Sequence, residues 1–490
     1  MNDKNCCTQL CGVALLGLEV ISVDIEVDLS RADKTQLTIV GLPDAAVKES
    51  KERVWAAIKN CGFKPGPIRS TINLAPGALR KEGAIYDLPI ALGLLGCLGH
   101  LPISQLNNYL IAGELGLSGE VRPINGVIAI AIHARKHGKK GILIPAINAP
   151  EAAVVDGIDI FPIHHLKEAV HFFHSPSSLS PQPSSISDDL FNPRTPTIDF
   201  VDIKGQSHVK RAMEIAAAGG HNVILSGPPG TGKTMIAKAL IGIMPRMTLE
   251  ESLEVTKIHS IAGLSSKHQG LITQRPFRSP HHTISYAGLI GGGTVPKPGE
   301  VSLAHGGILF LDELPEFSRN ALEVLRQPLE DRQVTISRAG GNFTFPTHFT
   351  CIAAMNPCPC GYYGHPEKNC RDSELQIERY RRKISGPLLD RIDMHVTVPS
   401  VKYREIMEGK NSESSATIRE RVEGAHERQR SSSKKLLLGN GCQSLLREAI
   451  DQMGISLRAH DRILKVAQTI AHLEGQETIS EDHLIEALNY

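Results

Sequence analysis

The chain has 490 residues, of which 41% are hydrophobic and 21% are charged, and this ordinary globular composition predicts about three domains with buried cores. The formal net charge of +1 excludes attraction of a polyanion by a global field, so DNA would have to bind a local patch. No stretch is long and apolar enough for a membrane span, no signal peptide is visible, and ten cysteines in so long a chain indicate reduced thiols in the cytoplasm rather than a disulfide scaffold.

Residues 1–173 alternate between apolar strands and helical patterns. "VDIEVDL" (23–29) and "GILIP" (141–145) predict strands, and residues 44–60 predict a helix with one apolar side. The most apolar segment, residues 88–99, predicts a buried helix. Residues 174–196 are dominated by Ser and Pro and predict a solvated linker.

After the linker, four short apolar runs are separated by long segments. They are "NVILSG" (222–227), "ILFLDE" (308–313), "TCIAAMN" (350–356) and "MHVTVPS" (394–400). Such runs are typical of a parallel sheet buried on both faces, so we expect an α/β domain at residues 197–400. The pattern is helical from residue 401 to 490, which predicts a separate helical domain.

The segment "SGPPGTGKT" (226–234) matches the pattern G-x-x-x-x-G-K-[ST] and stands between a predicted strand and a predicted helix. Its glycines let backbone N–H groups cradle phosphate oxygens, Lys233 reaches the outer phosphates, and Thr234 offers its hydroxyl to Mg²⁺. We therefore expect ATP with Mg²⁺ to bind at one continuous set of residues: Gly227, Pro228, Pro229, Gly230, Thr231, Gly232, Lys233 and Thr234.

Two further strand ends carry polar groups that ATP hydrolysis needs. Asp312 ends the second apolar run and is predicted to hold the water shell of Mg²⁺, while Glu313 is predicted to orient and deprotonate the attacking water. Asn356 ends the third run and is predicted to lie near the γ-phosphate, although it could merely start a turn before Pro357.

Arg391 stands in "SGPLLDRID" (385–393), in a short loop before the fourth run. It could pair with Asp390 or Asp393 of its own loop. In a ring it could instead reach the nucleotide of the neighbouring subunit and stabilise the charge of the transition state. Ring assembly depends on the second of these interpretations.

From about residue 198 to its end, the chain resembles a magnesium-chelatase-like AAA+ ATPase, in which a segment like "DIKGQ" (202–206) leads into the nucleotide pocket. Three segments resemble the competence-protein ComM (YifB-type) family more narrowly: "RPFRSPHHTISYAGLIGGG" (275–293), "NPCPCG" (356–361) and "SGPLLDRID". This resemblance implies a homo-hexameric ring that moves branched DNA during natural transformation, that is, a DNA helicase for branch migration.

The resemblance also implies roles for single residues. Arg391 matches the arginine finger, and Arg458 matches the sensor-2 arginine of a helical lid at residues 401–490, with Arg462 as the second choice. Residues 334–349 match a hairpin that faces the central pore in related rings, which makes Arg338 a candidate DNA contact.

Residues 1–173 resemble the Lon-type Ser–Lys protease domain, an α+β fold, through "KEGAIYDLPIAL" (81–92) and residues 113–145. Ile85 and Ile128 occupy the positions of the nucleophilic serine and the lysine base, so the pair that acyl transfer needs is absent. We expect a catalytically dead scaffold that serves assembly or DNA contact.

Clusters of positive side chains are the other candidate DNA contacts. One cluster comprises Arg275, Arg278, His281 and His282. A second is the run "RQRSSSKK" (428–435), which could equally be a solvated face. Aromatic residues make up only 4% of the chain, so we expect phosphate contacts rather than base stacking to dominate.

Cys358, Cys360 and Cys370 lie close together in "NPCPCGYYGHPEKNCRD" (356–372), but a structural zinc site needs four ligands. The ComM family usually has a fourth cysteine two residues after the third, where this chain has Asp372. Three interpretations stay open: a Cys₃Asp site, a Cys₃His site that uses His365, or three reduced cysteines that only pack. Bound zinc would hold the loop and take no part in hydrolysis.

The same phosphate machinery would serve an ATPase of the chelatase or MoxR type that remodels a protein partner, and this alternative to a DNA motor stays open. Two other classes fit less well. An active protease is disfavoured by Ile85 and Ile128, and a nucleotide switch without hydrolysis is disfavoured by Glu313 and Arg391.

Overall fold

The computed structural model describes residues 6–400, apart from 185, 187–190, 192–196, 265–269, 294–295 and 339–340, and residues 413–490, apart from 432–436, 440 and 454–455. It forms two compact units, Met1–Leu190 with Ser252–Ile272 and Phe191–Glu251 with Thr273–Tyr490. Much of the predicted linker and the start of the predicted helical domain lie outside the described residues. Within the described parts, no helix combines the length and the apolar character that crossing a membrane requires.

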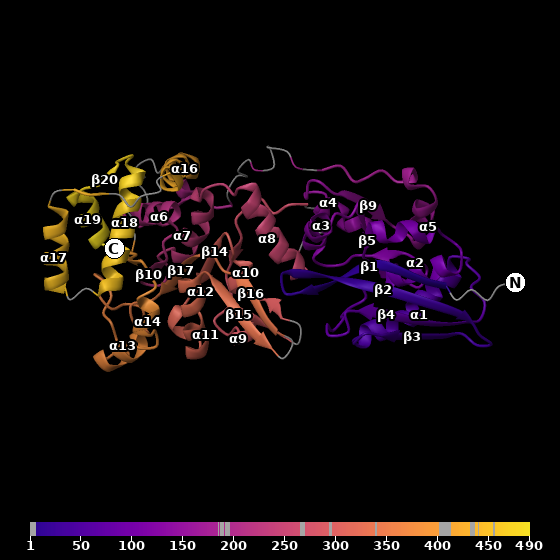
Figure 1. Cartoon of the computed structure of the whole chain (residues 1–490). Helices are drawn as coiled ribbons and strands as arrows, with labels where there is room; N and C mark the ends of the chain where they lie inside the picture. The colour runs from indigo at the N-terminus through magenta and orange to yellow at the C-terminus, as the bar shows by residue number, and fades with distance from the viewer. Residues whose placement is uncertain are drawn as a thin grey trace. The chain divides into compact units, whose positions relative to one another are not determined.

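The N-terminal unit is built on a seven-stranded mixed sheet with the order β3-β4-β2-β1-β5-β8-β9 (Figure 1). Pairing is antiparallel between β1 and β2 and between β2 and β4, and it is parallel between the other neighbours. The two predicted strands are confirmed as parts of β2 and β8. The strands are β1 (Cys6–Leu16), β2 (Glu19–Arg31), β3 (Gln36–Val40), β4 (Ile68–Ala75), β5 (Tyr109–Ile111), β8 (Gly141–Pro145) and β9 (Asp159–Ile163).

The helices of this unit follow from the same patterns. The predicted helix at 44–60 is confirmed as α1 (Ala45–Asn60), which begins where the Asp44 carboxylate accepts a hydrogen bond from the N–H of Val47 at 2.7 Å. The apolar segment forms α2 (Asp87–Cys97), buried along nearly its whole length. The remaining elements are α3 (Val127–Lys136), α4 (Ala149–Ala152), α5 (Leu166–His174) and the small hairpin β6 (Glu114–Leu115) and β7 (Val121–Arg122).

One segment from the middle of the chain belongs to the N-terminal unit. Residues 252–272, which include most of α8 (Leu249–Ile261), are part of it, although the sequence pattern gives no sign of this. Val255 and Ile258 are buried, and the Ser260 hydroxyl accepts a hydrogen bond from the N–H of Gly126 at 2.9 Å. The chain therefore returns to its first unit between the phosphate loop and the next strand.

The C-terminal unit contains a five-stranded parallel sheet with the order β11-β14-β17-β10-β18. All four predicted runs are confirmed as strands, and the parallel sheet expected for this part of the chain is present. Sequence reasoning missed the short edge strand β11, which pairs with β14. The strands are β10 (Val223–Ser226), β11 (Phe277–Arg278), β14 (Ile308–Leu311), β17 (Thr350–Met355) and β18 (Met394–Thr397).

The helices of this unit surround the sheet in the order of the chain. They are α6 (Ser207–Gly219), α7 (Lys233–Ala239), α9 (Tyr286–Ile290), α10 (Glu300–Leu303), α11 (Arg319–Val324), α12 (Arg326–Asp331), α13 (Glu374–Arg381) and α14 (Gly386–Leu389). The predicted hairpin is confirmed as β15 (Gln333–Arg338) and β16 (Gly341–Pro346), and a second, two-residue ladder joins β12 (Gly291–Gly292) to β13 (Lys297–Pro298).

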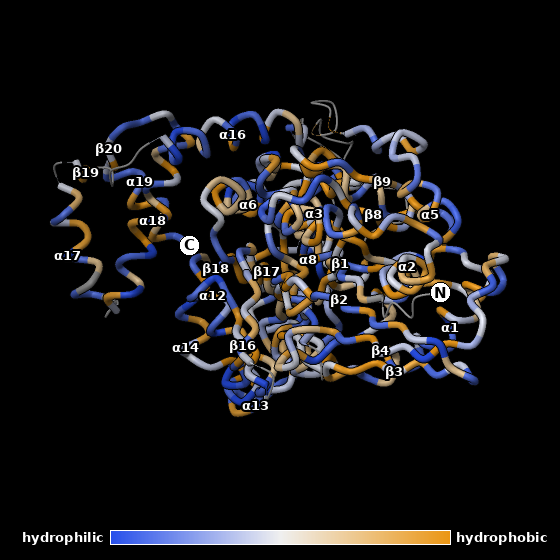
Figure 2. The backbone as a smooth tube through the Cα atoms, turned by 45° about the vertical axis from the view of Figure 1, so that its right-hand side comes forward, coloured by the Kyte–Doolittle hydropathy of each residue, from blue (hydrophilic) through white to orange (hydrophobic). Residues whose placement is uncertain are grey.

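Beyond residue 413 the chain is helical, as predicted, in α16 (Ser415–Ser431), α17 (Cys442–Met453), α18 (Leu457–Leu473) and α19 (Glu481–Leu488). A two-residue ladder of β19 (Leu437–Leu438) and β20 (Thr478–Ile479) is the exception among the described residues. Helix α16 is coloured mostly hydrophilic in Figure 2, and only Ser415, Ile418, Val422 and Ala425 of it are buried. These helices share one apolar core with the parallel sheet.

Candidate functional site

The phosphate loop joins β10 to α7 at the carboxyl end of the parallel sheet. Gly227 packs so closely that a side-chain carbon there would lie 2.2 Å from the carbonyl oxygen of Val398, so no other residue fits. Gly232 has φ +84°, which favours glycine, and it lets the chain turn directly into α7 at Lys233. The loop is thus shaped by the residues that the sequence pattern singled out.

Lys233 is held inside this loop. Its ammonium group donates hydrogen bonds to the carbonyl oxygens of Gly227 at 2.7 Å and Pro228 at 2.9 Å, and to the side-chain oxygen of Asn356 at 3.2 Å. Burial lowers the pKa of Lys233, an effect that the charge of Asp312 opposes. Asn356 therefore lies beside the phosphate loop, at the end of the neighbouring strand β17.

Thr234 and Asp312 form a second contact at the same edge. The Thr234 hydroxyl donates to the Asp312 carboxylate at 2.9 Å, which joins the start of α7 to the end of β14. A hydroxyl and a carboxylate are oxygen ligands of the kind that Mg²⁺ prefers alongside phosphates and water. The donor set therefore fits the expected Mg²⁺, which these two side chains would hold.

Glu313 follows in a left-handed backbone conformation with φ +52°, an uncommon conformation for a residue with a side chain. Its N–H donates to the Asp312 carboxylate at 3.0 Å, and its own carboxylate is 59% exposed. The Nδ1 atom of His282 lies 3.5 Å from a Glu313 carboxylate oxygen. Sequence reasoning proposed His282 only as a DNA contact and missed this pairing. The short strand β11, which runs parallel to β14 and ends near His282, was the available signal.

A cavity of about 500 Å³ opens beside the phosphate loop. Three stretches of chain line it: the segment around "DIKGQ", the phosphate loop with the start of α7, and the segment that carries the cysteines. The lining residues include Asp202, Ile203, Lys204, Gln206, Pro229, Thr231, Met235, Tyr362, His365 and Lys368. The amide of Gln206 also donates to the carbonyl oxygen of Thr231 at 3.1 Å, so the first stretch contacts the phosphate loop directly.

The two arginines that the resemblance singled out meet on one carboxylate. Arg391 forms an ion pair with Glu330 and donates to the carbonyl oxygen of Arg326 at 3.1 Å, while Arg458 approaches the other oxygen of Glu330 at 3.8 Å. Glu330 was not anticipated, because it lies some 60 positions before Arg391 on α12. The Arg391 side chain is only 13% exposed, whereas that of Arg458 is 62% exposed.

The acids of the Arg391 loop are used elsewhere. Asp393 accepts a hydrogen bond from the N–H of Asn222 at 2.8 Å, and Asp390 lies 3.9 Å from Arg462. Arg462 also donates to the carbonyl oxygens of Leu389 and Ile392 and is 16% exposed. The partner of Arg391 in its own chain is therefore neither of the two acids considered from the sequence.

Several candidate DNA contacts serve the fold instead. Arg275 donates to the carbonyl oxygens of Pro245 and Gly306 and pairs with Glu251, with only 10% of its side chain exposed, so its prediction as a DNA contact is wrong. Arg278 makes a two-pronged ion pair with Glu300 at 2.6 and 2.7 Å, which occupies its guanidinium.

The remaining candidate DNA contacts are more accessible or only partly described. Arg338 is exposed at the end of β15, where it donates to the carbonyl oxygens of Ser337 at 3.0 Å and Gly293 at 3.4 Å. His281 is hydrogen-bonded to the Thr283 hydroxyl at 2.9 Å. In the run 428–435, Arg428 donates to the carbonyl oxygen of His472, and residues 432–435 lie outside the described residues.

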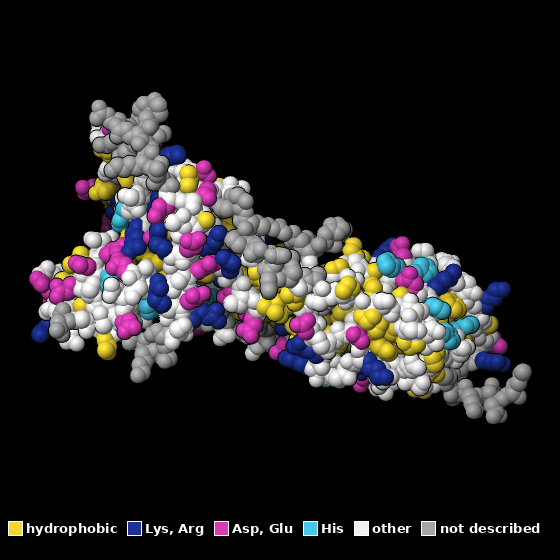
Figure 3. Space-filling view, turned by 90° about the horizontal axis from the view of Figure 1, so that it is seen from above, with side chains coloured by type: hydrophobic (Ala, Val, Ile, Leu, Met, Phe, Trp, Pro, Cys, Tyr) yellow, Lys and Arg dark blue, Asp and Glu magenta, His cyan; other side chains and the backbone are white. Residues whose placement is uncertain are grey.

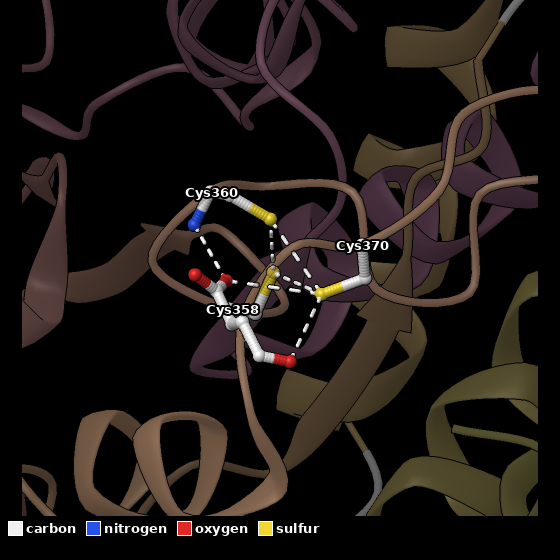
Figure 4. Close-up of side chains that lie close together, drawn as sticks. Cys358, Cys360 and Cys370 are labelled. Atoms are coloured by element: carbon white, nitrogen blue, oxygen red, sulfur yellow. Dashed lines mark hydrogen bonds between the residues drawn. The ribbon is translucent and has the colours of Figure 1, made fainter.

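The three cysteines of residues 356–372 come together, with their sulfur atoms pointing toward one another (Figure 4). The Sγ–Sγ distances are 3.4 Å between Cys358 and Cys360, 3.6 Å between Cys358 and Cys370, and 3.5 Å between Cys360 and Cys370. An oxygen of Asp372 lies 3.8 Å from the sulfur of Cys370 and accepts from the N–H of Cys360 at 2.8 Å. All four ligand atoms lie within 4.8 Å of one another.

This arrangement fits a tetrahedral metal site. Zinc–sulfur bonds of about 2.3 Å place the sulfur ligands of one ion roughly 3.8 Å apart, close to the spacing observed here. The alternative ligand His365 has its Nδ1 atom occupied by the N–H groups of Glu367 at 3.0 Å and Lys368 at 3.1 Å. Among the described residues, the geometry favours the Cys₃Asp set over the Cys₃His set.

In the N-terminal unit, Ile128 is fully buried on α3 and Ile85 is partly buried just before α2. Lys81, from the same motif as Ile85, is also fully buried and donates to the carbonyl oxygen of Pro76. Burial lowers the pKa of Lys81. The positions that would carry the protease chemistry thus hold aliphatic side chains that pack into the unit.

Known proteins place the whole chain. Competence protein ComM of Haemophilus influenzae is 42% identical over 492 residues, which cover 97% of this chain and 96% of that protein. The chain belongs to the ComM/YifB family. An uncharacterised protein YifB of Salmonella typhimurium is likewise 42% identical over 97% of the chain and 95% of its own length.

The family models agree with this membership and cover most of the chain in three parts. The magnesium chelatase subunit ChlI model matches residues 199–406, a second ChlI model matches residues 25–148, and the ChlI C-terminal model matches residues 412–490. Lon protease 2 of Bacillus subtilis is 28% identical over 176 residues, 32% of this chain and 31% of that protein. The ComM/YifB chain is thus magnesium-chelatase-like, with the AAA+ class of ATP site.

Proposed function

We propose that this ComM/YifB chain is an ATP-hydrolysing motor that acts on DNA as a homo-hexameric ring, a branch-migration helicase that promotes recombination during natural transformation in the cytoplasm. The observation that carries the ATPase part is the meeting of Lys233, Asn356, Thr234 and Asp312 at the carboxyl ends of three adjacent parallel strands. The name of the ComM relative supports the link to competence.

The residues divide the hydrolysis between them. Lys233 holds the outer phosphates, and Glu313 orients the attacking water and takes its proton, with Asn356 beside both. When bound to Thr234 and Asp312, Mg²⁺ supplies positive charge to the phosphates. Arg391 and Arg458 complete the site of a neighbouring subunit and of the lid, respectively, by stabilising charge that develops on the phosphates.

The DNA part of the proposal rests on the β15–β16 hairpin and on Arg338. Charges of both signs are interspersed over the face of the C-terminal unit that Figure 3 shows, so DNA contact requires a small local site rather than a broad positive surface. Arg338 offers such a site because it is exposed at the hairpin end and contacts the phosphate backbone without reading sequence. The N-terminal unit serves as a scaffold without protease activity.

An ATPase assay with and without forked or four-way DNA tests this function. We expect branched DNA to stimulate turnover and labelled four-way junctions to be resolved only when ATP is hydrolysed. Turnover that no DNA structure changes, together with ATP-dependent binding of a protein partner, would replace the DNA motor by a chelatase-type remodelling ATPase. The Lys233→Ala chain is the control that removes nucleotide from either machine.

A further inference from the structure

The segment that carries the cysteines, residues 357–372, here called the cysteine loop, connects β17 to α13 without any helix or strand of its own. Its two ends are brought together by Cys358 and Cys360 on one side and Cys370 and Asp372 on the other. Residues 361–369 therefore form a closed excursion whose base is the four-ligand cluster.

This excursion leans on the phosphate loop. At Gly361, where φ is +82°, a side-chain carbon would lie only 2.7 Å from the ring of Pro229. Any larger residue there would push the cysteine loop away from the phosphate loop. The two loops are thus in direct contact within the C-terminal unit.

Three side chains of the excursion form one wall of the cavity beside the phosphate loop. Tyr362, His365 and Lys368 line it together with Ile203 and Gln206 from the opposite stretch of chain. The Lys368 ammonium lies 4.7 Å from the centre of the Tyr362 ring, and the His365 ring packs edge-on against that ring at 5.8 Å. Because these side chains pack on one another, they move as a group with the loop that carries them.

The neighbouring tyrosine points elsewhere. Tyr363 lines a separate depression with Ile377 and Arg381 of α13, and the Arg381 guanidinium lies 5.0 Å from the centre of its ring. Its N–H donates to the sulfur of Cys358 at 3.3 Å. Two adjacent tyrosines thus face two different surfaces, which gives a matched pair for experiment.

We propose that Cys358, Cys360, Cys370 and Asp372 bind a zinc ion that fixes the cysteine loop as one wall of the nucleotide pocket, so that metal occupancy sets the affinity for ATP through Tyr362. This inference rests on the proposed ATPase function and assigns the metal a place in nucleotide binding, not only in bracing the sheet. The reason is physical: a Gly- and Pro-rich excursion has no ladder or helix to hold it, so the cluster at its base decides where Tyr362 stands.

The test measures metal content and nucleotide affinity on the same full-length protein. Zinc is counted by elemental analysis, and the affinity for a fluorescent ATP analogue is measured with Mg²⁺ present throughout. The protein is measured as purified, after treatment with a chelator selective for transition metals, and after Zn²⁺ is restored. We expect one zinc per chain, an affinity about tenfold weaker after chelation, and recovery with Zn²⁺.

Variants separate the wall from the metal. Cys370→Ser is expected to lose zinc and weaken analogue binding to the same extent, whereas Cys7→Ser, at an exposed cysteine of the N-terminal unit, changes neither. Tyr362→Ala keeps zinc and weakens binding by about five- to tenfold, the range for loss of one stacked aromatic contact. Tyr363→Ala keeps both zinc and affinity.

The outcomes discriminate clearly. Unchanged affinity after chelation, or in Tyr362→Ala, overturns the inference while the ATP site stands. A chain that takes up far less than one equivalent of Zn²⁺ overturns it as well and leaves the cysteines as packing residues. If the wild-type chain binds no analogue, or binds it as well as Lys233→Ala does, the proposed ATPase function itself fails.

Discussion

At the scale of single residues, the hydrolytic edge of the sheet is organised around Glu313. Its backbone is held in a left-handed conformation next to Asp312, and its carboxylate is exposed yet paired with His282. An exposed base needs a partner that restricts its rotamers, because a free glutamate side chain loses considerable entropy when it must point at one water. The residue that matters most is thus supported by one that sequence reasoning assigned to another task.

Glu313→Gln keeps the size of the side chain and removes the base. We expect the variant to bind ATP but to turn over about two to four orders of magnitude more slowly, the usual effect of losing a positioned general base. Lys233→Ala should lose nucleotide binding too, because its ammonium is replaced by nothing. Native turnover in Glu313→Gln, measured by phosphate release, would show that another group is the base.

His282→Ala is expected to lower turnover by about tenfold and leave the affinity for ATP unchanged, because a hydrogen bond to a charged group contributes on the order of 1.5–3 kcal/mol. His281→Ala is the matched control, since its ring is bonded to Thr283 and not to Glu313. A faster His282→Ala enzyme would reverse the assignment and make His282 a restraint on the base rather than its support.

At the scale of elements, helices α12 and α18 and the loop after α14 converge on Glu330, where Arg391 and Arg458 meet. An arginine that already has a carboxylate partner will leave it only for a group with more negative charge, and the phosphates of ATP are such a group. The pairing is therefore compatible with transfer of Arg391 to a neighbouring subunit, at the expense of one partly exposed ion pair.

Mixing experiments test that transfer. Arg391→Ala and Lys233→Ala chains are each expected to be nearly inactive alone, whereas mixed rings recover part of the ATPase activity because some interfaces then hold an intact Lys233 site and an intact Arg391. Recovery is measured as phosphate release against the mixing ratio. Mixed rings shown to form by labelled subunits, yet without any recovery, would leave Arg391 as a structural partner of Glu330.

Helix α8 shows the same dependence on tertiary context. Ile258→Ala removes a fully buried side chain of the N-terminal unit and is expected to lower its free energy of unfolding by about 2–5 kcal/mol. Leu264→Ala is the matched control from the same segment, where the side chain is 49% exposed, and should change stability by less than about 0.5 kcal/mol. Thermal melts of the two full-length variants decide it, and equal losses would contradict the assignment of α8 to this unit.

The sequence predicted those features whose cause is local. A glycine-rich loop between an apolar run and a helical pattern, or acids directly after a run, can be recognised because the determining residues are neighbours along the chain. His282, Glu330 and the wall formed by Tyr362 could not be recognised in this way. Each depends on which strands lie side by side or on how a long loop closes, and sequence spacing does not encode either.

At the scale of the whole molecule, the near-neutral net charge determines how DNA can be bound. Arg338 is expected to contact backbone phosphates, so Arg338→Ala should weaken DNA binding and reduce the salt dependence of its logarithm by roughly 0.7–0.9 per contact. Turnover without DNA should stay unchanged, as it should in Arg382→Ala, an exposed arginine outside the hairpin. A variant with the wild-type salt dependence would remove Arg338 from the DNA site.

The return of residues 252–272 to the N-terminal unit also sets a timetable for the ribosome. An N-terminal domain made from one continuous stretch can finish folding as soon as that stretch has emerged. Here the last buried piece is translated only after the linker, the phosphate loop and the start of α8, which delays completion by roughly 4 to 16 s at ordinary rates of synthesis. During that interval the surface that α8 later covers is open to chaperones, and nascent chains halted before residue 252 should recruit them more strongly than chains halted after residue 272.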